Sequence, residues 1–316
     1  MNNTENIKIH FMRYIFISFL VAFALCTTAQ DSLNYSKSEM IYGRKDGMAL
    51  TMTVLTPKLK PNGKAIISVI SGNWVSSERS RARLPEWSQI YIDNGYTVFG
   101  VMVGSQPRYT IPEEVADLKR AVRFIKYNAK DYSIDPNKIG ITGSSSGGHL
   151  SLMIATADDI ANSRSTDPVD KVSSRVQAAA VFFPPTDFIN YGAVNTSGKI
   201  NQAGLVFAKV AAAFDFKVWN DTTGTFVSIT DTEKRLAIAK EISPINSVSS
   251  DDPPVVIIHG DKDMLVPKQQ SESIIAKYKE ANVPNNLIIK EGGGHGWKDM
   301  EIEEKIFLDW FNKYLK

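Results

Sequence analysis

Uninterrupted apolar runs alternate with amphipathic stretches along most of the chain. Such runs are typical of strands buried on both faces of a sheet, and they occupy 65–70, 96–103, 178–183 and 255–258. Residues 48–55 alternate between apolar side chains and threonine, which predicts an edge or meander strand. A further strand is predicted at 287–289.

Amphipathic stretches between these runs predict helices. Thr110 and Glu113 form a capping box that opens one helix, and Val115, Leu118 and Val122 lie on a single stripe of it. Other helices are predicted through Trp87 up to Asn94-Gly95, and at 148–157, 268–281 and 302–315. Alternation of buried strands with helices predicts an α/β fold with a mostly parallel central sheet and helices on both faces.

Residues 188–242 break this rhythm. They contain a predicted helix of small residues at 203–216, a threonine-rich turn at 221–225 and a predicted helix at 231–241. We expect this insertion to lie above the sheet as a cap over a pocket. Phe214, Phe216 and Trp219 either line such a cap or pack beneath it. The chain is therefore expected to form one domain, 30–316, with a cap insertion at about 188–242.

The first 29 residues have the pattern of a secretory signal peptide. Lys8 and Arg13 precede the apolar run 15–25, which is too short to span a bilayer, and Thr27 and Ala29 fit a cleavage site. We expect a secreted or periplasmic protein without a stable membrane span. The single cysteine, Cys26, lacks the small preceding residues of a lipoprotein signal, so no lipid anchor is expected.

Charge and composition exclude several partners. Thirty-six basic and 34 acidic residues nearly balance, and no basic stripe is present, so nucleic acid is not an expected partner. No cluster of histidines and carboxylates has metal-ligand spacing, and no dinucleotide fingerprint occurs. We therefore expect neither a metal nor an organic cofactor.

A candidate nucleophile follows a short apolar strand, at the start of a predicted helix. Gly143, Ser145 and Gly147 form G-x-S-x-G, the pattern of a strained strand-to-helix turn that exposes a serine. Flanking side chains would collide in such a turn, which explains the glycines. The backbone N–H of Ser146 would point to the place where an oxyanion forms.

A serine nucleophile requires an imidazole base and an orienting carboxylate. Of the three histidines after the leader, His295 lies in a glycine loop that lets its ring reach another strand end. His149 follows Ser145 within the helix and is expected to be structural, and His259 ends a buried strand, where it caps or packs. Asp263 is the predicted acid, with Asp261 as a turn-former.

From about residue 41 to 316 the chain resembles the α/β-hydrolase superfamily, especially feruloyl-esterase-like and hormone-sensitive-lipase-like carboxylesterases. The resemblance rests on the segments 117–124, 134–139 and 143–150, on His259-Gly260-x-x-Asp263-x-x-Val266-Pro267, and on Gly294-His295-Gly296. It implies an α/β-hydrolase fold with Ser145 as nucleophile, Asp263 as acid and His295 as base.

One segment departs from this family. Where its members carry His-Gly-Gly-Gly-Trp, this chain has Ile70-Ser71-Gly72-Asn73-Trp74. A backbone N–H does not depend on the side chain, and asparagine tolerates left-handed geometry. We therefore expect an oxyanion hole from the N–H groups of Ser146 and Asn73, with Gly72 as a further candidate. Trp74 is either a wall of the substrate pocket or a packing residue.

These features predict a secreted serine hydrolase that cleaves carboxylic esters through an acyl-enzyme. The resemblance alone implies the substrates, which would be acetyl or feruloyl esters of small molecules or of polysaccharides. Two alternatives stay open. A prolyl-oligopeptidase-like peptidase shares the catalytic domain, but no acidic pair for a substrate amine is evident. A non-catalytic carbohydrate-binding protein on the same fold would explain the altered oxyanion segment.

Overall fold

The computed structural model describes residues 33–156, 159, 161–195, 197 and 199–316. The predicted signal peptide, 1–29, and Cys26 lie outside the described residues. Within the described part of the chain, every helix is too short or too polar to cross a bilayer.

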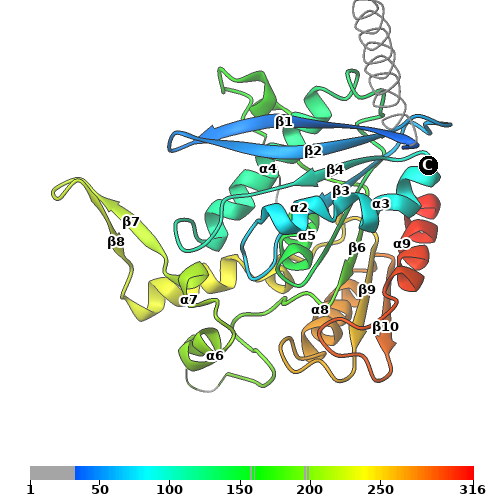
Figure 1. The fold of residues 1–316 in the computed structure, drawn as a ribbon. Coiled ribbons are helices and arrows are strands. Elements are labelled where there is room, and N and C mark those ends of the chain that lie inside the picture. The colour runs from blue at the N-terminus through cyan, green and yellow to red at the C-terminus, as the bar shows by residue number, and fades with distance from the viewer. Residues whose placement is uncertain (1–32, 157–158, 160, 196, 198) are drawn as a thin grey trace, which may run out of the picture.

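A mixed sheet of eight strands organises the molecule, in the order β1-β2-β4-β3-β5-β6-β9-β10. β1 and β2 form an antiparallel hairpin, and β2 pairs antiparallel with β4, whereas the remaining neighbours are parallel. Figure 1 shows the hairpin along one edge. The strands are β1 (Tyr35–Lys45), β2 (Met48–Pro57), β3 (Ala65–Val69), β4 (Thr97–Val101), β5 (Ile139–Ser144), β6 (Ala178–Phe182), β9 (Val255–Gly260) and β10 (Asn285–Lys290).

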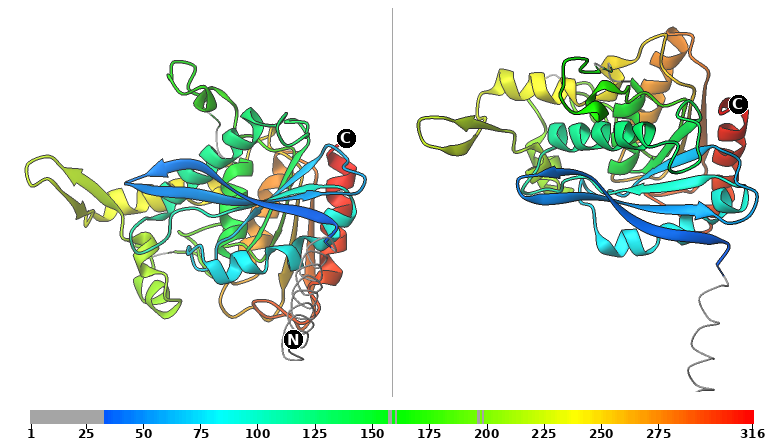
Figure 2. Two further views of the ribbon diagram at one scale, coloured as in Figure 1. Left: turned by 45° about the horizontal axis from the view of Figure 1, so that its top comes forward. Right: turned by 90° about the horizontal axis from the view of Figure 1, so that it is seen from above.

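Helices cover both faces of the sheet, as predicted (Figure 2). Apolar side chains of α4, α5 and α8 share one core cluster with Ile67 and Ile141 of the sheet. Those of α3 and α9 share a second cluster with Ile66 and Val98, whose side chains point the other way. The helices are α2 (Glu78–Ala82), α3 (Leu84–Asp93), α4 (Ile111–Tyr127), α5 (Ser146–Thr156), α8 (Gln269–Glu280) and α9 (Glu301–Tyr314), with short 3₁₀ turns η1 (Pro168–Lys171) and η3 (Pro244–Ser247).

Local signals set several of these boundaries. The capping box predicted for α4 is present, because the Thr110 N–H donates to Glu113 Oε2 at 2.7 Å. β1 was not predicted, since most of its side chains are exposed and it has no apolar run. It forms because β2 offers an open edge, and β2 consequently lies one strand inside the sheet.

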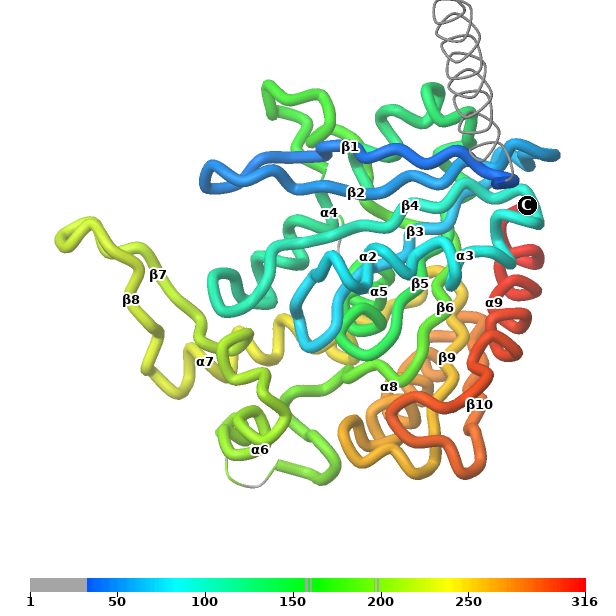
Figure 3. Tube along the Cα trace, viewed as in Figure 1, coloured from blue at the N-terminus to red at the C-terminus, as the bar shows by residue number. Residues whose placement is uncertain are grey.

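The insertion between β6 and β9 extends away from the sheet, and its hairpin β7–β8 protrudes from the molecule, as the tube in Figure 3 shows. It contains α6 (Gln202–Phe207), η2 (Ala211–Phe214), β7 (Lys217–Asn220), β8 (Thr225–Ser228) and α7 (Thr232–Glu241). The single helix expected at 203–216 is wrong: Lys209 adopts a left-handed conformation (φ 59°), which ends the helix. Phe214 and Phe216 are buried, whereas Trp219 is half exposed on the hairpin.

One buried carboxyl group is unusual. Glu114 of α4 is fully buried, and neither side-chain oxygen has a hydrogen-bond partner among the described residues. Burial, with the neighbouring charge of Asp117, raises its pKa from 4.5 to about 10, although Lys45 opposes the shift. Glu114 is therefore neutral in the folded protein at neutral pH, while it ionises in the unfolded chain.

Glu114→Gln is expected to stabilise the protein increasingly as pH rises. The folded state holds the Glu114 proton above pH 4.5 and the unfolded chain releases it, so wild-type stability falls between about pH 5 and pH 10. The variant has no proton to release at this position. Its free energy of unfolding should therefore exceed that of the wild type by a margin that grows by about 1.4 kcal/mol per pH unit. Denaturant unfolding at several pH values measures the difference; parallel stability curves for the two proteins would contradict the assignment.

Candidate active site

Ser145 occupies a strained turn between β5 and α5. Its φ is +53°, in the left-handed region that L-residues avoid. A Cβ on Gly143 would lie 2.5 Å from the backbone carbon of Gly147, and one on Gly147 would lie 2.7 Å from the Val69 carbonyl oxygen. The motif needs its glycines because these backbone segments touch. The turn holds the serine side chain at the carboxyl ends of the parallel strands.

Three side chains from distant segments meet at this turn. His295 Nε2 lies 2.9 Å from Ser145 Oγ, and His295 Nδ1 lies 2.7 Å from Asp263 Oδ2. The structure thus brings together the three residues that the sequence analysis selected. A carboxylate only accepts hydrogen bonds, so Nδ1 carries the proton and Nε2 is free to accept the Ser145 proton.

Asp263 is held as an ionised acceptor. Its Oδ1 accepts hydrogen bonds from the backbone N–H groups of Leu265 and Val266, both at 2.9 Å. Burial disfavours the charge, but hydrogen bonds from His259 and His295 outweigh it and place the pKa of Asp263 well below its usual range. The carboxylate therefore stays charged at any pH where a neutral imidazole can act as a base.

His259 supports this acid loop from inside the protein. The fully buried ring places Nε2 2.8 Å from the Val266 carbonyl oxygen and 3.4 Å from Asp263 Oδ2. Both groups are acceptors, so Nε2 carries the proton, and Nδ1 accepts from the Ser271 hydroxyl at 2.7 Å. The expectation that His259 packs is confirmed. Its contact with the acid was not foreseen, although it stands only four residues before Asp263.

His149 has a structural position, as expected. The ring is completely buried, with Nε2 2.8 Å from the Ile242 carbonyl oxygen, and Nδ1 accepts from Trp74 Nε1 at 3.2 Å. Burial lowers the pKa of His149 to about 4, although the bond to the Ile242 carbonyl opposes the shift. The imidazole therefore stays neutral and anchors the Trp74 side chain.

Asp261, the second aspartate after β9, binds the loop that carries His295. Its Oδ1 accepts from the Gly292 N–H at 2.7 Å, which links the end of β9 to the loop after β10. Asp261 was expected to cap N–H groups of its own turn, whereas its side chain caps a backbone N–H of the loop that carries His295.

The segment before Trp74 forms a tight turn beside Ser145. Gly72 and Val75 exchange backbone hydrogen bonds of 3.0 and 2.9 Å around Asn73 (φ 53°) and Trp74 (φ 54°), the geometry of a type I′ turn. Asparagine thus adopts the left-handed conformation that was expected of it. Gly72 is wrong as an oxyanion donor in this conformation, because its N–H is bonded to Val75.

The two backbone N–H groups that the sequence analysis favoured as oxyanion donors have no protein acceptor among the described residues. One belongs to Asn73, which has no bonded backbone partner; the other belongs to Ser146, the first residue of α5, whose N–H has no acceptor within the helix. Both candidates from the sequence therefore keep the free donor that an oxyanion requires. The side chain of Ser146 is separately engaged with the Ser71 hydroxyl at 3.1 Å.

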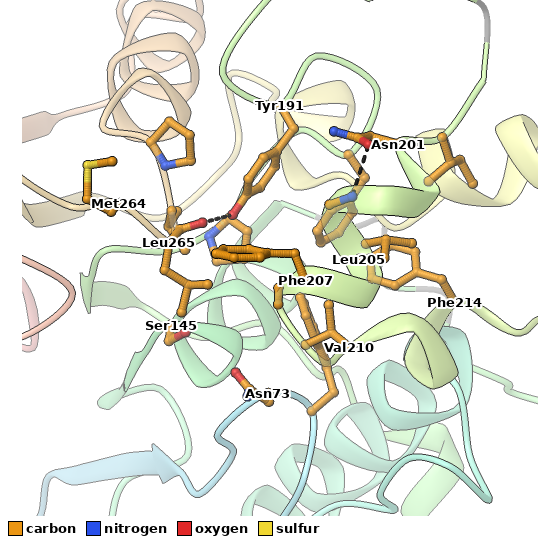
Figure 4. A pocket seen from close by; sticks show the side chains of 18 residues that line it. Asn73, Ser145, Tyr191, Asn201, Leu205, Phe207, Val210, Phe214, Met264 and Leu265 are labelled. Carbon is orange, nitrogen blue, oxygen red and sulfur yellow. Dashed lines mark hydrogen bonds between the residues drawn. The ribbon is translucent and has the colours of Figure 1, made fainter.

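An apolar pocket of about 200 Å³ opens at Ser145 (Figure 4). Asn73 and Ser145 lie at one end, and side chains of the insertion and of the acid loop form its walls, including Tyr191, Leu205, Phe207, Val210, Phe214 and Leu265. Trp74 both lines the pocket and packs edge-on against Phe188 and Phe214. The insertion thus contributes side chains to the pocket.

No group of three or more histidine, cysteine or acidic side chains has the geometry of a metal site within the described residues. The chemistry that this arrangement can perform is nucleophilic: a serine, a base and an acid in one hydrogen-bonded row.

The chain is similar to several proteins that are named as esterases. The chain is 28% identical to Esterase LipQ of Mycobacterium tuberculosis over 71% of its own length and 48% of that protein. It is 30% identical to an acetylxylan esterase of Xylanibacter ruminicola over 46% of its length and 28% of that protein. The chain thus spans about half the length of LipQ and less than a third of the length of the acetylxylan esterase.

Among solved structures, a truncated carbohydrate esterase from gut microbiota superimposes with a TM-score of 0.67 at 25% identity, covering 90% of this chain and 99% of the other. The fold is that of the α/β-hydrolase-like esterases. Residues 52–278, most of the sheet and the whole insertion, match one protein family. This chain belongs to the BD-FAE family.

Proposed function

We propose that the protein is a serine hydrolase that cleaves carboxylic esters. The observation that carries this proposal is the row Ser145–His295–Asp263 with hydrogen bonds of 2.9 and 2.7 Å, at the mouth of an apolar pocket. Several relatives are named as esterases, which supports the same chemistry.

In the proposed reaction, Ser145 Oγ attacks the acyl carbon and passes its proton to His295 Nε2. The carbonyl electrons move to the oxygen, which the N–H groups of Asn73 and Ser146 stabilise. When the intermediate collapses, the ester C–O bond breaks and His295 gives the proton to the departing alcohol. A water molecule then attacks the acyl carbon and gives a proton to His295. The bond between this carbon and Ser145 Oγ breaks, His295 returns the proton to Ser145, and the acid is released. Asp263 holds the imidazolium throughout.

We propose small acyl groups on polysaccharides, acetyl or single-ring aromatic, as substrates. The pocket is apolar and, at about 200 Å³, is smaller than the roughly 300–1,000 Å³ of drug-sized sites. A long fatty-acyl chain would not fit in it, whereas a short or planar acyl group would. The names of the acetylxylan esterase and the carbohydrate esterase among its relatives support the polysaccharide.

A panel of esters tests this proposal. We expect hydrolysis of 4-nitrophenyl acetate, methyl cinnamate and acetylated xylan, and little of 4-nitrophenyl palmitate. Ala208→Trp fills the pocket from its α6 side, so it should lower kcat/KM for cinnamate by tenfold or more, roughly the effect of one poorly fitting group, and spare acetate. Cleavage of prolyl-4-nitroanilide without ester cleavage would contradict the esterase and favour the peptidase.

We also propose that the protein is exported. Support comes from the residues of 1–29 described above, with two basic residues, an apolar run and small residues before Gln30. The mass of the protein recovered from culture medium or periplasm tests it. An uncleaved protein confined to the cell interior would contradict it.

A further inference from the structure

We propose that Gln106 is a positioning residue of the oxyanion hole. Gln106 holds the Gly72–Val75 turn so that Asn73 presents its N–H to the substrate, and it joins this turn to the wall of the acyl pocket. The inference rests on the proposed function, since an oxyanion hole has a role only in a site that transfers acyl groups.

Three hydrogen bonds place Gln106 between the two segments. Its side-chain Nε2 donates to the Asn73 carbonyl at 2.5 Å, and its backbone N–H donates to the Trp74 carbonyl at 3.1 Å. Its Oε1 accepts from the Ala213 N–H at 3.1 Å. A carbonyl only accepts and an amide N–H only donates, so the partners allow one orientation of the side-chain amide.

The turn needs this support because its backbone is strained. Both central residues have positive φ, which suits asparagine but not tryptophan. Packing anchors the buried Trp74 side chain, whereas Asn73 is exposed and gains no such hold. Gln106 donates hydrogen bonds to the consecutive carbonyl groups of Asn73 and Trp74. These bonds fix the two peptide planes that follow Asn73, and so keep the turn in its left-handed conformation.

The third bond couples this turn to the pocket. Ala213 belongs to η2, and its neighbours Val210 and Phe214 line the pocket beside Ser145. A single side chain therefore ties the segment that would contact the acyl group to the loop that would stabilise its developing charge. A displacement of η2 would be transmitted to Asn73 through two hydrogen bonds.

Gln106→Met is the first test, because methionine keeps the length of the side chain and loses both side-chain hydrogen bonds. Removing an oxyanion donor outright costs about 100- to 1,000-fold in kcat. Loosening the turn should cost less, about 10- to 100-fold in kcat for 4-nitrophenyl acetate, with KM within about twofold, because the charge exists only in the transition state. Gln89→Met on α3, which loses a 2.7 Å bond to Asp93 far from the turn, should retain the wild-type kcat.

Gln106→Glu separates a positioning role from a merely structural one. The carboxylate accepts from Ala213 but repels the Asn73 carbonyl; once protonated, it donates to that carbonyl as glutamine does. The activity of Gln106→Glu relative to wild type should therefore rise as pH falls, whereas the same ratio for Gln106→Met stays flat. Dividing by the wild-type activity at each pH removes the pH dependence that the three proteins share.

Each outcome decides between the proposals. An active wild type together with unchanged kcat in Gln106→Met overturns the inference alone. An inactive, folded wild type overturns the proposed function and this inference with it. If Gln106→Met has lost its cooperative melting transition, the pH ratio of Gln106→Glu decides, and a flat ratio overturns the positioning role.

Discussion

Ser145→Ala is expected to lower kcat for ester hydrolysis by about a millionfold, to the residual rate that binding and the oxyanion hole supply. The methyl group leaves the turn unchanged, because alanine needs no more space than serine at φ +53°. His295 Nε2 then has no proton to take at 2.9 Å, and no acyl-enzyme forms. Release of 4-nitrophenol measures the loss.

A neighbouring serine is the matched control for this prediction. Ser144 is exposed at the end of β5, where it pairs with Phe182 of β6, and its hydroxyl has no hydrogen-bonded partner among the described residues. Ser144→Ala should keep wild-type activity. If Ser145→Ala retained a substantial fraction of the rate, or if both variants lost it equally, Ser145 would not be the nucleophile.

Asp263→Asn is expected to lower kcat by about 10³- to 10⁴-fold while the protein stays folded. The asparagine amide can donate to His295 Nδ1, which would move the imidazole proton to Nε2 and leave no acceptor for the Ser145 hydroxyl. It also removes the negative charge that stabilises the imidazolium at 2.7 Å. Release of 4-nitrophenol from 4-nitrophenyl acetate measures the loss.

The second aspartate of the same strand end provides the control. Asp261→Asn keeps an oxygen to accept the Gly292 N–H, so its effect should stay below about tenfold, the value of one weakened hydrogen bond. Equal losses in the two variants would show that the loop tolerates neither change and that Asp263 has no special relation to His295.

The parts of the fold that follow from burial were predictable. β3, β4, β6 and β9 are interior strands of the sheet, and their residues are almost all buried, so the sequence shows them as apolar runs. β1 was missed because its pairing with β2 leaves most side chains in solvent. The break at Lys209 was also missed, since nothing local distinguishes this lysine from one inside a helix.

The candidate site likewise has features that the sequence could predict and features that it could not. The glycines around Ser145 and the order Ser145, Asp263, His295 follow from local steric rules and chain order. The bonds from Gln106 to Asn73 and from His259 to the Val266 carbonyl depend on how separate segments meet. Spacing along the chain carries no signal for such contacts, so only the structure could show them.

Labelling with a fluorophosphonate probe tests the central claim most directly. This reagent requires an activated serine and an oxyanion hole but no knowledge of the substrate. We predict one modified peptide, which mass spectrometry assigns to Ser145, and no modification in Ser145→Ala. An unlabelled wild-type protein with a cooperative melting transition would contradict the account, because it would mean that the row Ser145–His295–Asp263 does not activate the serine.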